Sequence, residues 1–324
     1  MGFCAESLCR PDAPHWAPMS TDADPPRRVP RDALLDLACA PGHLLRRAQR
    51  AHGVLWSEEF GTELTGPQFA VLSSVARHDD IDQVTVGHEA SLDKSTAVGI
   101  VRRLVRDGWV AAASDPHDGR RKVLHLTDAA GEALAPLTLR VRGVQERLLA
   151  PLDPATRGRL IDDLATLAYE GAPPAPEAPA ALGLPSERTV GHLVRRAQAV
   201  HNARWAEAFD GALTGPQYAV LVALALAEPA DQTALAPVAA LDKSSLSEVV
   251  ERLVARELVD AAPHDADRRR KTLRLTGAAR RVLPGFTVTA ASVQDRLLVH
   301  LPRRRRPAFV RTLAALVGAH ALHE

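Results

Sequence analysis

Two short runs of basic side chains at equivalent places in the two halves of this sequence concentrate positive charge, and their chemistry suits phosphate binding. The runs are Arg120, Arg121 and Lys122, and Arg268, Arg269, Arg270 and Lys271. Arg binds phosphate through paired N–H groups and enters narrow minor grooves of DNA. A charge run can also be a solvated surface, but the arginine content, the turn location and the recurrence favour contact with nucleic acid. An aspartate near the start of each run, Asp118 or Asp267, can orient the guanidiniums by ion pairing.

The rest of the chain does not share this positive charge. Lys and Arg (40) nearly balance Asp and Glu (39) over 324 residues, which leaves a formal net charge of +1. A nucleic acid or membrane surface would therefore have to be bound by local patches. Hydrophobic residues make up 46% and aromatic residues 4%, a composition typical of helical domains with an aliphatic core.

Two short polar segments, each directly after an aspartate, are candidates for the first turn of a DNA-binding helix. They are Lys94, Ser95 and Thr96 in the first half of the chain, and Lys243, Ser244 and Ser245 in the second. A first helical turn points side chains and free backbone amides at phosphates and base edges. The alternative is that Asp, Ser and Thr here only cap the helix, which requires no nucleic acid. The residues alone leave both interpretations open.

A histidine and a tryptophan four residues apart occur twice and are candidates for a ligand pocket. The pairs are His52 with Trp56 and His201 with Trp205. Imidazole and indole on one helix face suit an anionic aromatic compound, whose affinity should fall as pH rises through the imidazole pKa of about 6.5. The alternative is that these histidines are core or interface residues.

Further arginines accompany these candidates. Arg46, Arg47, Arg195 and Arg196 could add charge to the pocket or lie on a solvated helix face. The run from Arg303 to Arg306 begins the last helix, where we expect solvent exposure or an ion-pair partner rather than phosphate.

An internal repeat with an offset of 149 residues organises the chain. Residues 42–48 read GHLLRRA and residues 191–197 read GHLVRRA, and 41 of the 86 positions in 42–127 are identical to their partners in 191–276. The segments LTGPQ and LDKS recur at the same offset without a gap. The two halves therefore share one fold.

Within a copy, the pattern predicts helices followed by one hairpin. Apolar spacings of three and four, with Thr, Asp and Pro at helix starts, predict helices over about 41–60, 65–75, 82–90, 93–107, 127–148 and 153–168. Between the fourth and fifth helices the period changes to two, which predicts strands over 110–114 and 122–126. A short helix, a turn, a second helix and a basic hairpin are the parts of a winged helix-turn-helix.

Composition predicts the domain boundaries. Residues 1–30 read as a disordered tail, 31–170 as the first unit, 171–187 as a Pro- and Ala-rich linker, and 188–324 as the second unit. The three cysteines, Cys4, Cys9 and Cys39, are too few for a disulfide framework, and their spacing does not favour a metal site. We expect a cytoplasmic protein without metal, cofactor or membrane span.

The sequence resembles the MarR-type (multiple antibiotic resistance regulator) transcriptional regulators. The resemblance rests on LTGPQ, the helix start LDKST, its end RRLVRDGWV and the wing DPHDGRRKVLHLT, and it covers about residues 41–168 and 190–320. It implies a mainly helical fold with small β-hairpin wings, a dimer joined by its terminal helices, and a DNA operator released when small aromatic or acidic ligands bind. It also implies DNA contacts from the helix starts named above and from the wing residues Asp118, Arg120, Asp267 and Arg269.

The sequence departs from the family pattern in two ways. One chain carries both units, so we expect an intramolecular pseudo-dimer, with further oligomerisation optional. Val98 and Gly99, and in the second copy Ser247 and Glu248, stand where the family often has polar or basic base-contacting side chains. The two halves should therefore not read identical DNA sequences.

Two functions are consistent with these features. The first is a ligand-responsive transcriptional regulator, a repressor, that acts as a fused pseudo-dimer on double-stranded DNA and responds to a small aromatic or anionic effector. The second is a duplicated winged-helix scaffold that has lost specific DNA binding and serves as a small-molecule binding protein or a cofactor-free enzyme. The sequence contains no recognisable catalytic motif, so we expect no enzyme.

Overall fold

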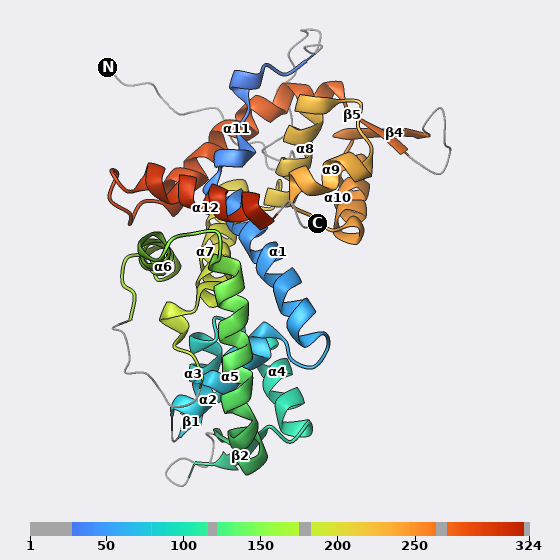
Figure 1. Cartoon of the computed structure of the whole chain (residues 1–324). Coiled ribbons are helices and arrows are strands. Elements are labelled where there is room, and N and C mark those ends of the chain that lie inside the picture. Colours follow the sequence, from blue (N-terminus) through green and yellow to red (C-terminus); the bar gives the residue numbers. More distant parts are fainter. Residues whose placement is uncertain (1–27, 79, 116–121, 175–182, 264–270, 321–324) are drawn as a thin grey trace, which may run out of the picture. The chain divides into compact units, whose positions relative to one another are not determined.

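The computed structural model of the chain (Figure 1) describes residues 28–78, 80–115, 122–174, 183–263 and 271–320. It is mainly helical with small antiparallel sheets, as the sequence predicts. The first copy contains η1 (Arg31–Ala33), η2 (Leu37–Cys39), α1 (Pro41–Phe60), α2 (Gly66–Arg77), β1 (Ile81–Asp82), α3 (Gln83–Glu89), α4 (Lys94–Arg106), β2 (Val110–Ser114), β3 (Lys122–Leu126), α5 (Asp128–Leu149) and α6 (Pro154–Ala168). The second copy contains η3 (Ser186–Arg188), α7 (Val190–Phe209), α8 (Gly215–Ala227), α9 (Gln232–Ala239), α10 (Lys243–Ala255), β4 (Val259–Pro263), β5 (Lys271–Leu275), α11 (Gly277–Leu297) and α12 (Arg306–His320).

Polar caps set the helix starts at the predicted positions. Thr65 and Gln68 form a reciprocal capping box at the start of α2, and Thr214 and Gln217 form the same box at the start of α8. Such caps satisfy backbone N–H groups that have no partner inside the helix. The short strand β1, which pairs with β3 through Ile81 and Leu124, was not predicted, because two residues are too few to show an alternating pattern.

The described chain packs as two compact units that do not follow the repeat boundaries. The smaller unit contains residues 28–37 and 202–293, and the larger contains 38–201 and 294–320. The smaller unit has one hydrophobic core, around Tyr218 and Leu246. The larger has two, one around Leu72 and Leu104 and another around Leu44, Leu164 and Phe309. The predicted domain boundaries describe the repeat and remain a prediction.

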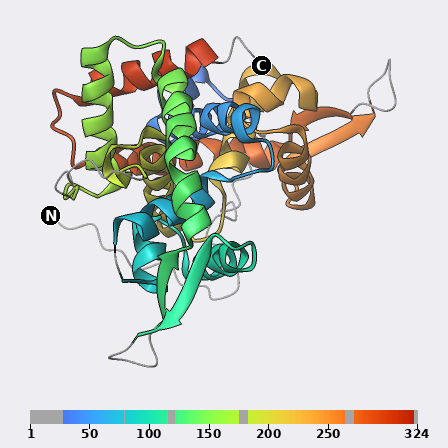
Figure 2. The ribbon, with the colours of Figure 1, turned by 60° about the horizontal axis from the view of Figure 1, so that its bottom comes forward.

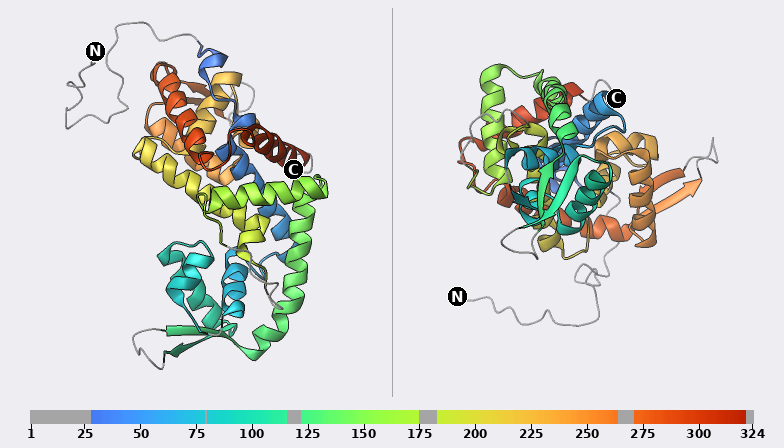
Figure 3. Two further views of the ribbon diagram at one scale, coloured as in Figure 1. Left: turned by 90° about the vertical axis from the view of Figure 1, so that its left-hand side faces the viewer. Right: turned by 90° about the horizontal axis from the view of Figure 1, so that it is seen from below.

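Each unit carries one hairpin. In the larger unit β2 pairs antiparallel with β3 from Val110 opposite Leu126 to Ser114 opposite Lys122, and the hairpin projects beyond the helices of that unit (Figure 2). In the smaller unit β4 pairs with β5 in the equivalent register. In the larger unit the long helix α5 runs from the hairpin toward α6, which is clearest in the left view of Figure 3.

Helices from both copies meet inside the larger unit through a reciprocal contact. The Gln145 side chain on α5 accepts a hydrogen bond from the Gly191 backbone N–H at 2.8 Å and lies 3.2 Å from His52 Nε2. At the positions 149 residues away, Gln294 accepts from the Gly42 N–H at 2.8 Å and lies 3.3 Å from His201 Nε2.

Both glycines of this contact are required by close approach. A Cβ on Gly191 would lie 2.2 Å from His52 Nε2, and a Cβ on Gly42 would lie 2.1 Å from His201 Nε2. Each copy therefore places its histidine ring on the first helical turn of the other copy.

Replacing Gly191 by Ala should lower the free energy of unfolding by about 1–3 kcal/mol, the usual effect of overpacking a well-packed site. The loss should shrink in a His52→Ala background, where the ring is absent. Gly53→Ala on α1 is the matched control, because a Cβ there meets nothing within 4 Å. Urea unfolding of wild type, Gly191→Ala, His52→Ala, the double variant and Gly53→Ala measures these differences. An equal loss on Gly191→Ala in both backgrounds would contradict the packing explanation.

Candidate nucleic-acid interface and adjacent pocket

The first turn of α4 is organised by its N-cap, Asp93. The Asp93 carboxylate accepts from the Thr96 N–H at 2.9 Å, from Ser95 Oγ at 2.6 Å and from Thr96 Oγ1 at 2.5 Å. These hydrogen bonds to the charged form hold the pKa of Asp93 well below its usual range. The side chains of Lys94, Ser95 and Thr96 are all exposed. The capping role is therefore present, and the same side chains remain accessible to a ligand.

The second copy repeats this arrangement at α10. Asp242 accepts from the Ser245 N–H at 2.8 Å, from Ser244 Oγ at 2.6 Å and from Ser245 Oγ at 2.7 Å. These bonds likewise hold the pKa of Asp242 well below its usual range. Lys243 is exposed beside them.

The exposed face of α4 is basic, which the sequence analysis did not single out. Ala97, Ile100, Val101 and Leu104 are buried against the rest of the unit. The exposed side includes Lys94, Arg102, Arg103 and Arg106. The signal was present in the sequence, because Arg102 and Arg103 fall between buried positions of the predicted helix and Arg106 follows the last of them.

Most of the predicted wing residues lie outside the described part of the chain. These are Asp118, Arg120, Arg121, Asp267, Arg268, Arg269 and Arg270. The two that are described are exposed at the starts of β3 and β5: Lys122, whose Nζ donates to Ser114 Oγ at 2.7 Å, and Lys271. Their contacts with nucleic acid remain a prediction.

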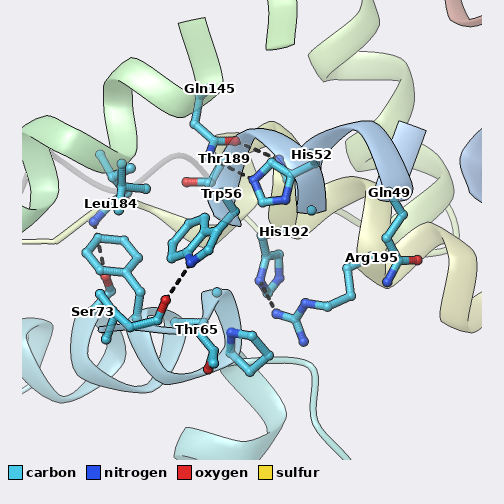
Figure 4. Close-up of a pocket in the computed structure, with 18 of the residues that line it drawn as sticks. Gln49, His52, Trp56, Thr65, Ser73, Gln145, Leu184, Thr189, His192 and Arg195 are labelled. Carbon is cyan, nitrogen blue, oxygen red and sulfur yellow. Dashed lines mark hydrogen bonds between the residues drawn. The ribbon is translucent and has the colours of Figure 1, made fainter. Parts of the chain in front are cut away.

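A pocket of about 300 Å³ lies in the larger unit next to the helix-turn-helix (Figure 4). The predicted residues His52 and Trp56 line it from α1, and Phe69 and Ser73 line it from α2. His192 and Arg195, from the first helix of the other copy, also line it. From the sequence, Arg195 could lie either in the pocket or on a solvated helix face, and in the structure it lines the pocket.

The imidazole of His52 is not a cation at neutral pH. Burial, and then the positive charge of Arg195, lower the pKa of His52 to about 4. The expectation that anion affinity falls as pH rises through about 6.5 is therefore wrong for this site, because the ring is already neutral there. Burial also lowers the pKa of Arg195, to about 10, which leaves Arg195 protonated at neutral pH as the cation of the pocket.

The indole of Trp56 forms part of the apolar wall. Its Nε1 donates to the Leu64 carbonyl at 2.6 Å, and its ring stacks on Phe60 with centroids 4.7 Å apart. The indole N–H is therefore satisfied within the protein, and the ring offers an apolar surface to a ligand.

Arg195 also holds the turn that precedes α4. Its guanidinium donates to the Ala90 carbonyl at 2.7 Å and to the Ser91 carbonyl at 3.1 Å. Arg196 donates to Ser91 Oγ at 2.8 Å, and His192 Nε2 lies 3.2 Å from the same hydroxyl. Ser91 has a positive φ of 53°, which is unusual for a residue with a side chain. Side chains of the second copy thus fix the turn of the first copy's helix-turn-helix.

His201 and Trp205 are both buried, with 2% and 6% of their surface exposed. His201 packs on Gly42 in the larger unit, and Trp205 Nε1 donates to the Leu213 carbonyl at 2.6 Å in the smaller unit. Both residues are therefore buried packing residues, which was the alternative given from the sequence. A role of His201 and Trp205 in ligand binding remains a prediction.

The arginine run before α12 has the expected ion-pair partner. Arg305 lies 2.7 Å from the carboxylate of Asp163 on α6. Arg306 donates to the Leu301 carbonyl at 3.1 Å. In the described residues, no three His, Cys, Asp or Glu side chains converge as metal ligands, and none of the helices is long and apolar enough to span a bilayer.

These elements define a winged helix-turn-helix protein with a basic second helix and an adjacent pocket. The MarR family model matches residues 62–121 and again 213–270. The HTH-type transcriptional repressor NicR of Pseudomonas putida is 33% identical over 131 residues, which are 40% of this chain and 83% of NicR. The chain belongs to the MarR family, in two tandem copies.

Other relatives are also transcriptional regulators. The transcriptional regulator HosA of Escherichia coli O157:H7 is 31% identical over 39% of this chain and 93% of its own length. A crystal structure of the PcaV transcriptional regulator from Streptomyces coelicolor in complex with its natural ligand shares 38% identity, with a TM-score of 0.41, and covers 43% of this chain and 98% of PcaV.

Acidification should destabilise the protein through His52. Its pKa is about 4 in the folded chain and about 6.5 when unfolded, so the unfolded state binds more protons between these values. The contribution of His52 to the free energy of unfolding should therefore fall by about 2 kcal/mol from pH 7.5 to pH 5. Urea unfolding of wild type and His52→Gln at both pH values measures it, and equal losses in the two proteins would show that His52 does not titrate this way.

Proposed function

We propose that this chain is a ligand-responsive, DNA-binding transcriptional repressor in which two fused copies replace the two subunits of a dimer. The reciprocal contacts of His52 with Gly191 and of His201 with Gly42 support the pseudo-dimer. They join the first helices of the two copies as a dimer interface would. The name of the relative NicR, a transcriptional repressor, supports the direction of regulation.

Helix α4 and the wings provide the DNA-binding surface. The α4 start offers Lys94, Ser95 and Thr96 at a helix N-terminus, and its exposed arginines suit contact with phosphates. The basic wings, of which Lys122 and Lys271 are described, suit the backbone or the minor groove. The partner in this proposal is double-stranded DNA.

The effector is a small aromatic anion bound in the pocket that α1, α2, α5 and α7 line. Trp56 and Phe69 supply apolar walls, and Arg195 supplies a cation that pairs with a carboxylate or phenolate. About 300 Å³ matches a compact ligand of this class. The neutral His52 contributes hydrogen bonding rather than charge.

The proposal rests chiefly on Arg195, which contacts both the pocket and the turn before α4. The guanidinium lines the pocket and also donates to the carbonyls of Ala90 and Ser91, directly before α4. An anion that pairs with Arg195 competes with these carbonyls, so the position of α4 depends on whether the pocket is occupied. Coupling of this kind is reciprocal: bound DNA weakens effector binding as much as effector weakens DNA binding.

Arg195→Ala should weaken the binding of a simple aromatic acid, such as benzoate or a hydroxybenzoate, roughly tenfold or more, because a charge-assisted hydrogen bond is lost. Calorimetry on the protein without DNA measures the affinity. Arg46→Ala is the matched control, since Arg46 is the repeat equivalent of Arg195 and does not line this pocket. An Arg195→Ala protein that binds like wild type would place the effector site elsewhere.

One chain should occupy one operator. A shift assay with DNA from around the protein's own gene, at stated salt, identifies the complex, and sedimentation gives its composition. A minimal specific complex with two chains would contradict the fused pseudo-dimer, and the absence of any specific complex would favour the alternative of a small-molecule binding scaffold.

A further inference from the structure

Helices α4 and α10 bury equivalent residues, but their exposed faces differ in charge. In α10, Leu246, Val249, Val250 and Leu253 are buried at the repeat equivalents of the four buried residues of α4. The helices therefore fit their units in the same way, and packing does not dictate their surface charge.

The two helices differ in formal charge, and the charged side chains lie at solvent-exposed positions. Helix α4 carries Lys94, Arg102, Arg103 and Arg106 and no acidic residue, a formal charge of +4. Helix α10 carries Lys243 and Arg252 against Glu248 and Glu251, a formal charge of zero. With the C-cap residues Asp107 and Arg256 the values are +3 and +1.

The differences lie in the middle and last turns of the helix. Glu248 stands at the equivalent of Gly99, Glu251 at that of Arg102, and Ala255 at that of Arg106. Glu248 and Glu251 are both exposed, and Glu248 pairs with Arg252 at 3.2 Å, which occupies one of the two cations that α10 has.

These charges act in opposite ways on a DNA duplex. Each phosphate contact by Lys or Arg releases counterions and adds affinity, whereas a carboxylate on the same helix face repels the backbone. Each helix packs against the first strand of its own hairpin, α4 against β2 (Figure 2) and α10 against β4, so the two copies differ in the charge of the helix surface and not in this packing. The affinity for DNA should therefore come mainly from the first copy.

We propose that the chain recognises only one half-site of its DNA target. Helix α4 binds this half-site, and the acidic residues Glu248 and Glu251 prevent α10 from binding a second one. This rests on the proposed function and specifies its DNA partner. The target is a duplex with one recognised half-site and a weakly constrained flank, not an inverted repeat. Glu248 and Glu251 are the residues that set this asymmetry.

The test begins with selection by the full-length protein from a duplex library whose random segment spans about 30 base pairs, enough for two half-sites one helical turn apart. The expected result is a motif confined to one half-site. Two equally specified half-sites would overturn the inference while leaving the proposed function intact. Failure to select any sequence, or to bind any duplex at low salt, would overturn both.

Charge variants then test the two helices on the selected duplex. Arg102→Gln should weaken binding roughly tenfold and reduce the salt slope by about one, as expected for a lost phosphate contact. Glu251→Gln should strengthen binding, and Glu251→Arg, which copies the α4 residue, should strengthen it further and raise the salt slope. Both positions, Arg102 and Glu251, are exposed helix surface, so circular dichroism should show unchanged folding in all three variants.

One result would reverse the assignment of α10. Glutamate can accept a hydrogen bond from the cytosine amino group in the major groove. If Glu248→Gln or Glu251→Gln lowers affinity for the selected duplex but not for unrelated duplexes, these carboxylates read bases and the inference is wrong. An Arg102→Gln protein with unchanged affinity and salt slope would also overturn it.

Discussion

The packing of a histidine ring on a glycine in the first turn of another helix is the contact on which the other features depend. His52 can lie on Gly191 only because that residue lacks a Cβ, and the Gln145 side chain joins the two by bonding both. This contact fixes the start of α7 beside α1. One helical turn further along α7, Arg195 then reaches both the pocket and the turn before α4. A bulkier residue at position 191 would therefore disturb the interface, the pocket and the helix-turn-helix together.

The local structure was predictable because the same short-range signals occur in both copies of the repeat. The Thr65 capping box, the Asp93 cap and the change of period at Val110 each recur 149 residues later, and each is a short-range signal. Only two residues of the pocket wall, His52 and Trp56, were predicted, because they share one helix face and recur in the second copy.

The rest of the pocket could not be predicted, because its partners come from distant parts of the chain. His192 and Arg195 are about 140 residues from His52, and sequence spacing does not show which helices meet. The neutral state of His52 follows from its burial and from Arg195 nearby, neither of which is visible in the sequence. The arginines of α4 were overlooked for another reason: exposed charge on a helix usually indicates only solvation.

Fusion of two copies also removes a constraint that acts on a homodimer. In a homodimer every substitution appears twice about the symmetry axis, so a charge that weakens one DNA-binding helix weakens both. In the fused chain Arg102 can stay basic while its equivalent becomes Glu251, and Ser73 of the pocket has Val222 as its equivalent.

The pocket, Arg195 and α4 all belong to the larger unit. Arg195 makes two charge-assisted hydrogen bonds to the turn before α4, each worth about 1.5–3 kcal/mol. Allosteric coupling typically amounts to about 1–3 kcal/mol, so the proposed exchange of these two bonds for one effector anion would be large enough to supply it within a single unit.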